Sequence, residues 1–273
     1  MNLRIIIFTV LFLFFSSQIF AQNSQTKSPI AIGERVEIKS TILKENRVLN
    51  IYLPAGYSND SLNGYPVIYL LDGSMNEDFL HISGLVQFGS FSWIKMIPQS
   101  IVVGISNIDR KKDFTFPSTI KRDNKNFPTT GSSSSFISFI EQELQPFIDS
   151  NYNTSSVKTI IGQSLGGLLA TEILLTKPHL FDNFIIISPS LWWDKESLLK
   201  KEPSKFQSKK SIYIGVGKEG KVMERTAKEL YDKLKKSKQE NDDLYFEFFE
   251  KQDHGDVLHL AVYNAFDKIF RAE

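Results

Sequence analysis

The 273-residue sequence predicts an α/β protein in which helices cover both faces of a mostly parallel sheet of about eight strands. Short apolar runs recur along the chain, and stretches with helical periodicity lie between them. The composition, 41% hydrophobic and 23% charged, is that of a globular protein. No repeat or linker divides residues 35–273, so we expect one domain there.

The first 21 residues have the features of a secretory signal peptide. Arg4 precedes an apolar run from Ile5 to Phe15, and we expect cleavage after the small residue Ala21. A membrane anchor is the alternative, although the run is shorter than the roughly 20 residues that span a bilayer. The mature protein is then expected to be periplasmic or secreted, without stable membrane insertion. Residues 22–34 are polar and are predicted to form a flexible N-terminal segment.

Charge and composition argue against several functional classes. The chain has 32 Lys and Arg against 31 Asp and Glu, and a net charge of +1 does not favour a nucleic-acid partner. The absence of cysteine excludes disulfides, thiolate metal sites and cysteine nucleophiles. No pattern of metal ligands stands out, so neither a metal nor an organic cofactor is expected.

The predicted strands begin with an antiparallel hairpin. Residues 35–43 and 47–53 are separated by a turn at Lys44-Glu45-Asn46. The apolar runs that follow are typical of strands buried on both faces. They comprise residues 66–71, 100–105, 157–161, 184–187, 211–216 and 245–249.

Four stretches have the apolar spacing of helices. They comprise residues 135–148, 167–176, 222–237 and 256–270. Residues 111–135 are instead polar and rich in Pro, Ser and Asn. We expect this stretch to be a long loop that covers the functional site like a lid.

The most informative segment is Gly162-Gln163-Ser164-Leu165-Gly166, which matches the G-x-S-x-G pattern of a serine nucleophile. A predicted strand precedes it and a strong helix former follows it, as the pattern requires. Backbone N–H groups at a helix N-terminus can stabilise an oxyanion. A glycine-rich turn that merely starts a helix is the alternative. The setting favours Ser164 as the nucleophile of an α/β-hydrolase.

A serine hydroxyl needs an adjacent base, and the chain has four histidines. His254 follows the last predicted strand in Asp253-His254-Gly255, where this architecture presents its base. His81 is expected on an early helix or loop. His179 lies beyond the helix that follows Ser164. His259 is expected on the apolar side of the last helix, with a structural role.

The acid is expected between Ser164 and His254 in the chain. Glu219, after the strand at residues 211–216, is the first candidate, and Glu224 and Asp194 are alternatives. A solvated carboxylate paired with a neighbouring lysine remains possible for Glu219.

The oxyanion hole should use two backbone N–H groups, one of them from the residue after the nucleophile. We assign them to Leu165 and to Ser74, which follows the strand at residues 66–71 in Leu71-Asp72-Gly73-Ser74. Asp72 is expected to hold this loop by accepting backbone hydrogen bonds.

With these motifs in order, the sequence resembles the Putative esterase family of α/β-hydrolases. The resemblance rests on PVIYLLDG at residues 66–73, GQSLGG at 162–167, SPSLWW at 188–193 and Asp253-His254-Gly255, and it covers about residues 35–270. The family includes esterase D, mycolyltransferases of the antigen 85 type, feruloyl and acetyl-xylan esterases, and siderophore esterases. The resemblance implies the same roles for Ser164, His254, Ser74 and Leu165.

The acid is where this chain departs from the family. Many relatives carry a carboxylate one position after Glu219, where this chain has Gly220. Some siderophore esterases of the family are described as working with a Ser–His pair. The sequence therefore leaves open a triad with Glu219 and a pair without it.

Three side chains are candidates for substrate contacts. Trp192 and Trp193 should lie at the active-site end of the sheet, where one of them would face an aromatic or acyl group and the other would pack on the core. Arg110, in the charged run at residues 109–113, could contact an anionic group or remain solvated.

The predicted function is a serine carboxylic ester hydrolase that acts through an acyl-enzyme. Its substrate would be a small-molecule or glycan-linked ester, such as a siderophore, feruloyl or acetyl ester. An acyltransferase with the same nucleophile and a non-catalytic binding module on a hydrolase scaffold are the alternatives.

Overall fold

The computed structural model describes residues 27–203 and 205–271. The chain divides into two compact units, Met1–Ala31 and Ile32–Glu273. In the first unit, the described residues 27–31 are exposed and form neither helix nor strand. The predicted signal peptide at residues 1–21 lies outside the described residues. Everything below concerns the second unit.

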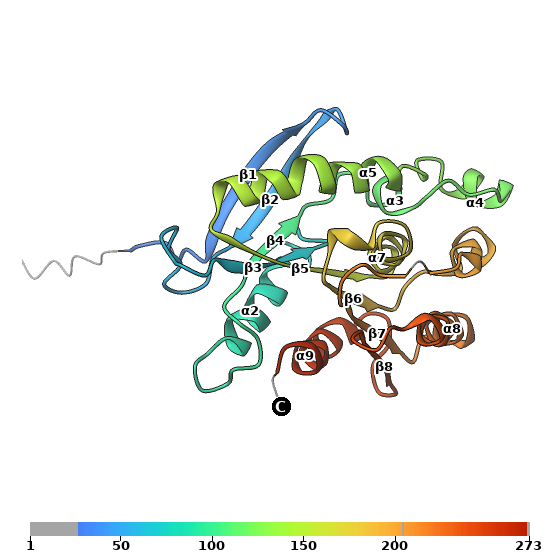
Figure 1. Ribbon diagram of the computed structural model, residues 1–273. Coiled ribbons are helices and arrows are strands. Elements are labelled where there is room, and N and C mark those ends of the chain that lie inside the picture. The colour runs from blue at the N-terminus through green and yellow to red at the C-terminus, as the bar shows by residue number, and fades with distance from the viewer. Residues whose placement is uncertain (1–26, 204, 272–273) are drawn as a thin grey trace, which may run out of the picture. The chain divides into compact units, whose positions relative to one another are not determined.

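An eight-stranded sheet with the order β1-β2-β4-β3-β5-β6-β7-β8 forms the centre of this unit (Figure 1). β1 pairs with β2, and β2 with β4, antiparallel; every other pair is parallel. The mostly parallel sheet with a leading hairpin is therefore confirmed. The strands are β1 (Gly33–Ser40), β2 (Glu45–Tyr52), β3 (Tyr65–Leu70), β4 (Ile101–Ile105), β5 (Thr154–Gln163), β6 (Asn183–Ile187), β7 (Ser211–Gly217) and β8 (Asp243–Phe249).

Helices cover both faces of the sheet, as the alternation of buried side chains along β3 shows. Val67 and Tyr69 belong to the core cluster that contains residues of α7 and α8, whereas Ile68 and Leu70 belong to the cluster formed with α2 and α9. The helical segments are α2 (Phe79–Gly89), α3 (Arg110–Phe114), α4 (Lys121–Asn126), α5 (Ser133–Phe139), η1 (Ile140–Leu144), α6 (Gln145–Asn151), α7 (Leu165–Thr176), η2 (Pro178–Leu180), η3 (Trp193–Lys200), α8 (Lys221–Ser237) and α9 (Val257–Phe270).

The hairpin turn lies earlier than the sequence predicts. The predicted turn at residues 44–46 is wrong, because residues 41–44 make the turn and β2 begins at Glu45. The Glu143 carboxylate holds this turn, since it accepts hydrogen bonds from Ser40 and from the backbone N–H groups of Thr41 and Ile42. Glu143 lies 101–103 residues away in the chain, so local turn preferences could not reveal its effect.

The predicted helix at residues 135–148 is continuous but irregular. Its centre, η1, is a π-helical turn, and Gln145 N donates to Ile140 O, five residues back. Pro146, the second residue of α6, has no N–H to donate, which favours an irregular hydrogen-bond pattern at this point.

Two further expectations are wrong. Residues 111–135 are not one long loop, since they contain most of α3, all of α4 and the start of α5. His259 is exposed on α9 rather than on its apolar side, and its ring lies 5.3 Å from that of His81 on α2. In the part of the chain that the structure describes, no helix combines the length and apolar character needed to cross a membrane.

Candidate active site

Ser164 occupies the tight turn between β5 and α7. β5 ends at Gln163 and α7 begins at Leu165, so Ser164 alone makes the reversal. Its φ of 59° and ψ of −117° lie in a region that residues with a side chain rarely adopt. A side chain at Gly162 would come within 2.5 Å of the Gly166 backbone, which explains the need for glycine there. The motif therefore forms a strained elbow between strand and helix.

The end of β6 and the loop after it fix the backbone of this elbow. Ser164 N donates to Ile187 O at 3.0 Å, and Ser190 N donates to Ser164 O at 2.9 Å. The hydroxyl of Ser164 lies 3.3 Å from the hydroxyl of Ser190, within hydrogen-bond distance. The side chain of Ser164 is thus presented beside a second hydroxyl group.

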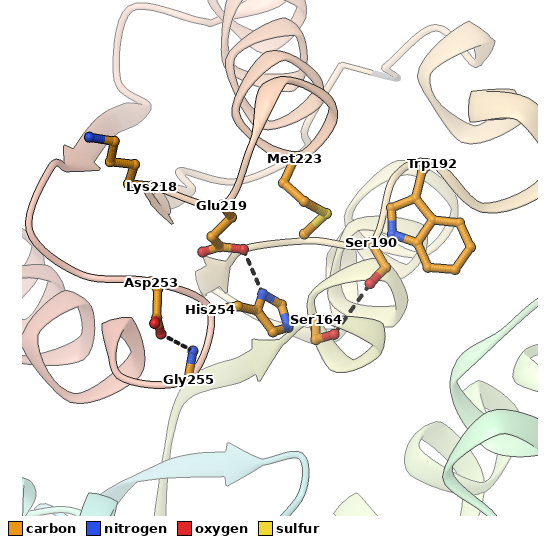
Figure 2. A pocket seen from close by; sticks show the side chains of 9 residues that line it. All are labelled: Ser164, Ser190, Trp192, Lys218, Glu219, Met223, Asp253, His254 and Gly255. Carbon is orange, nitrogen blue, oxygen red and sulfur yellow. Dashed lines mark hydrogen bonds and ion pairs between the residues drawn. The ribbon is translucent and has the colours of Figure 1, made fainter.

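His254, in the loop between β8 and α9, lines the same cavity as Ser164. Its Nδ1 lies 2.5 Å from Glu219 Oε2. Figure 2 shows the imidazole between Glu219 and Ser164, and all three residues line one cavity. Gln163 Nε2 donates to His254 O at 2.7 Å and so ties this loop to the elbow. Because Nδ1 faces the carboxylate, Nε2 is the nitrogen turned toward Ser164 (Figure 2).

Glu219 is held in place by two further donors. Its Oε1 accepts hydrogen bonds from the hydroxyl of Ser188 and, at 3.0 Å, from Gly217 N. The Glu219 side chain is only 2% exposed, whereas that of His254 is 47% exposed, so a buried carboxylate supports an imidazole that solvent can reach. The two alternative acids lie elsewhere.

Glu224 and Asp194 make hydrogen bonds that do not involve His254. Glu224 accepts from Gly220 N at 2.8 Å, and Asp194 accepts from Thr119 N at 2.7 Å. Of the three carboxylates that the sequence proposes, Glu219 is therefore the one in contact with the imidazole.

The contact between Glu219 and His254 shifts both pKa values. The hydrogen bond that His254 Nδ1 donates to Glu219 raises the pKa of His254 above its ordinary value, against the opposing effect of burial. Burial alone would raise the pKa of Glu219, but hydrogen bonds from His254, Ser188 and Gly217 hold that pKa below its ordinary value. The pair thus favours a carboxylate that can stabilise an imidazolium.

Two cavities meet at Ser164, Ser190 and Trp192. The larger has a volume of about 700 Å³ (Figure 2) and is lined by Ser164, Ser190, Trp192, Lys218, Glu219, Met223, Asp253, His254 and Gly255. The smaller has a volume of about 220 Å³ and is lined by Arg110, Lys111, Thr115, Phe127, Thr130, Ser164, Leu165, Ser190, Trp192 and Trp193. A ligand at Ser164 can therefore extend in two directions.

The two predicted oxyanion donors differ in their surroundings. Leu165 is the first residue of α7, so its N–H has no acceptor within the helix, and it lines the smaller cavity. Ser74, in the loop between β3 and α2, donates its N–H to Glu77 Oε2 at 3.2 Å. Among the residues described as lining the two cavities, Leu165 is present and Ser74 is not.

The three candidate substrate contacts also differ. Trp192 is 38% exposed and lines both cavities, whereas Trp193 is 1% exposed and donates its indole N–H to Phe116 O at 2.9 Å. Arg110 lines the smaller cavity, and its guanidinium is paired with Asp72. Asp72 accepts from the side chains of Arg110 and Asn107, not from the backbone groups that we expected.

Sequence reasoning missed Ser188 and Ser190. Both lie in the SPSLWW segment directly after β6, and both are buried. Their place after a strand that neighbours β5 in the sheet was the available signal. Within the described residues, no group of three or more His, Asp or Glu side chains could hold a metal ion.

Comparison with known proteins gives consistent results. Residues 40–256 match the family model described as Putative esterase. The chain is 30% identical over 267 residues to the ferri-bacillibactin esterase BesA of Bacillus subtilis, covering 89% of this chain and 92% of that protein.

Solved structures agree in fold. An IroE-like serine hydrolase from Shewanella oneidensis is 31% identical, with a TM-score of 0.77, over 87% of this chain and 80% of that one. The BES protein from Bacillus cereus is 30% identical, with a TM-score of 0.79, over 91% of this chain and all of that one. The α/β-hydrolase fold is therefore confirmed.

Proposed function

The chain belongs to the Putative esterase family and is a carboxylic ester hydrolase, and from this premise we propose that Ser164, His254 and Glu219 form its catalytic triad. One observation carries the proposal. Ser164 stands on a strained elbow in the same cavity as an imidazole whose Nδ1 lies 2.5 Å from a buried carboxylate. This is the arrangement that activates a serine hydroxyl.

The reaction proceeds in two steps. His254 Nε2 takes the proton of the Ser164 hydroxyl while Oγ attacks the ester carbonyl, and the imidazolium then protonates the departing alcohol. The product of this step is an acyl-enzyme on Ser164. In the second step, His254 takes a proton from water, which attacks the acyl group. The imidazolium then returns this proton to Ser164 Oγ as the acyl–oxygen bond breaks, which releases the acid and restores the free enzyme.

The backbone N–H groups of Leu165 and Ser74 stabilise the oxyanion in both steps. The position of Leu165 at the N-terminus of α7 supports its role, because its N–H points out of the helix end. The N–H of Ser74 contacts Glu77 in the free protein, so substrate has to compete with that carboxylate or share the donor with it.

The substrate we propose is a siderophore ester. BesA, a relative that matches 89% of this chain, is a ferri-bacillibactin esterase. The smaller cavity combines the aromatic rings of Phe127, Trp192 and Trp193 with the cations of Arg110 and Lys111, and this combination suits an aromatic group that bears negative charge. We further propose that the protein is exported, with removal of residues 1–21.

The proposal predicts that Ser164→Ala and His254→Ala each abolish hydrolysis of p-nitrophenyl acetate, by about 10³-fold or more, because each removes one half of the proton-transfer pair. Initial rates of both variants measure this effect. Ser150→Ala, at an exposed hydroxyl on α6, is the control and should keep the parent rate.

An unchanged rate in either variant removes that residue from the mechanism.

The substrate is tested on the parent enzyme with a catecholate trilactone, with and without iron, beside feruloyl and acetyl-xylan esters. We expect the highest kcat/KM on the trilactone, and a preference for either other ester rejects the siderophore assignment.

A further inference from the structure

Arg110 makes hydrogen bonds to the loop after β3 and to the last residue of β5, directly before Ser164. Its Nε and Nη2 donate to the two carboxylate oxygens of Asp72, at 2.5 and 2.9 Å. Its Nη2 also donates to Gln163 O, the carbonyl directly before Ser164, at 3.2 Å. One guanidinium group therefore joins the loop after β3 to the elbow after β5.

Asp72 is placed so that this pairing fixes the loop after β3. Its φ of 57° is left-handed, and the residue is only 7% exposed. The loop crosses closely over β4, since a side chain at Gly73 would lie 2.3 Å from Gly104 Cα. A side chain at Gly166 would in turn approach Asp72 Oδ2 to 3.4 Å, so the carboxylate lies against the elbow itself.

A second set of hydrogen bonds extends the connection to Ser74. Asn107 Nδ2 donates to Asp72 Oδ1 at 2.7 Å and to Glu77 Oε1 at 3.0 Å. Glu77 in turn accepts from Ser74 N. The hydrogen-bonded path thus runs from the carbonyl before Ser164 to the second N–H group that we assign to the oxyanion hole.

We infer that Arg110 and Asp72 form a brace that positions the loop carrying Ser74 against the nucleophile elbow, and that the pair acts on the reaction through this geometry. The inference rests on the proposed roles of Ser164 and Ser74. It gives Arg110 a function beyond the substrate contact that the sequence suggested. Asp72, for which we expected only local backbone hydrogen bonds, becomes the other half of the brace.

The chemistry of the two groups fits this role. A guanidinium binds a carboxylate through two parallel hydrogen bonds, which fix orientation as well as distance, and lysine cannot replace that fork. The ring of Phe114 also lies 5.6 Å from Arg110 Cζ and limits where the guanidinium can move. Because small displacements of catalytic groups reduce rates strongly, a rigid link between the two loops supports kcat.

The test separates positioning from substrate binding through the choice of substrate. p-Nitrophenyl acetate carries no anionic group on its acyl side, so loss of a substrate-binding cation alone should leave its hydrolysis intact. As a brace, Arg110 is needed for any ester. We expect Arg110→Lys, Arg110→Ala and Asp72→Asn each to lower kcat for p-nitrophenyl acetate by about 10- to 100-fold, with KM changed less than threefold.

Two further measurements use the pairing itself. The Arg110→Lys/Asp72→Asn double variant should be no slower than the slower single variant, since both changes break one unit. Guanidinium added at millimolar concentration should restore part of the activity of Arg110→Ala. Arg225→Met, which breaks an exposed Arg–Glu pair on α8, is the matched control and should keep the parent kcat.

The inference is overturned if the Arg110 variants keep the parent kcat for p-nitrophenyl acetate and show only a raised KM for an anionic ester. Additive losses in the double variant also overturn it. Should the Arg110 variants fail to fold, Asp72→Asn, which keeps the shape of the side chain, decides the question alone. Residual rate in Ser164→Ala measures the proposed function separately, so the two failures are distinguishable.

Discussion

At the residue scale, the role of Glu219 decides between a triad and a Ser–His pair. Its carboxylate has three donors, from His254, Ser188 and Gly217, and it is buried. A carboxylate so placed can fix the tautomer of the imidazole and stabilise its charged form. The geometry therefore favours the triad.

Glu219→Gln tests this role through the pH profile of kcat/KM. Only neutral His254 can accept the proton of Ser164, so activity is lost as the pH falls through the pKa of His254. Glu219 raises that pKa, and its removal should therefore move the acid limb to lower pH. The rate at the optimum should also fall, by about 10²- to 10⁴-fold, because the imidazole loses its orientation.

The matched control is Glu224→Gln, which removes a partly exposed carboxylate on α8, five residues beyond Glu219. This variant should leave unchanged both the acid limb of the pH profile and the rate at the pH optimum. An acid limb that stays in place in Glu219→Gln, with a small loss of rate, would indicate a working Ser–His pair. A loss as large as that of His254→Ala would reject the pair.

The sequence predicted those site residues whose signal is local. Ser164 lies in a motif with its strand and helix, and His254 lies in a short segment after the last strand. The partner of Arg110 was not predictable, because Asp72 lies 38 residues away and its backbone conformation gives no pattern in sequence. Side-chain pairs between residues far apart in the chain were therefore not predicted from the sequence.

At the scale of elements, a buried ion pair connects β2 to α3. Arg47 Nη2 lies 2.6 Å from Asp113 Oδ2, and both side chains are 1% exposed. Arg47 also pairs with Glu45 and lies over the ring of Phe136. The pair links the antiparallel part of the sheet to the short helix that begins with Arg110.

Asp113→Ala should therefore destabilise the protein by about 3 kcal/mol, because it leaves the buried Arg47 with Glu45 alone. Urea unfolding measures this free energy. Glu229→Ala, at an exposed pair on α8, is the control and should cost less than about 1 kcal/mol. Equal midpoints for the two variants would show that the buried pair does not stabilise the fold. Replacement of both partners, as Arg47→Met/Asp113→Leu, should recover most of the loss.

Elements were predictable to the extent that burial imposes a pattern. β4, β6 and β7 are buried along their whole length, and apart from a polar first residue in β6 and β7 they contain only apolar residues and glycine. The polar residues 111–135 gave no such pattern, because α3 and α4 are only five and six residues long. Helices this short depend on tertiary contacts more than on their own sequence.

At the scale of the whole molecule, the fold brings the site together at one edge of the sheet. Ser164, Glu219 and His254 follow the carboxyl ends of β5, β7 and β8, which are parallel to their neighbours. In open parallel sheets, such loops converge on the ligand site. Ser164 and His254 lie 90 positions apart in the sequence, and the strands and helices between them bring the two side chains to the same edge of the sheet.

The folded unit that carries this site begins at Ile32, and we predict that the residues before it are dispensable for catalysis. Every residue of the two hydrophobic core clusters lies beyond Ile32, and the described residues 27–31 are exposed. Chains that begin at Gln22 and at Ile32 should therefore hydrolyse p-nitrophenyl acetate with kcat/KM values within about twofold and melt within about 2 °C of each other. A shortened chain that is inactive or unfolds without cooperativity would show that the N-terminal segment belongs to the folded enzyme.

The chain that begins at Met1, expressed in a host with an export system, should yield a mature protein whose measured mass corresponds to an N-terminus at Gln22. A protein that retains Met1 in a membrane fraction would show that the segment is an anchor.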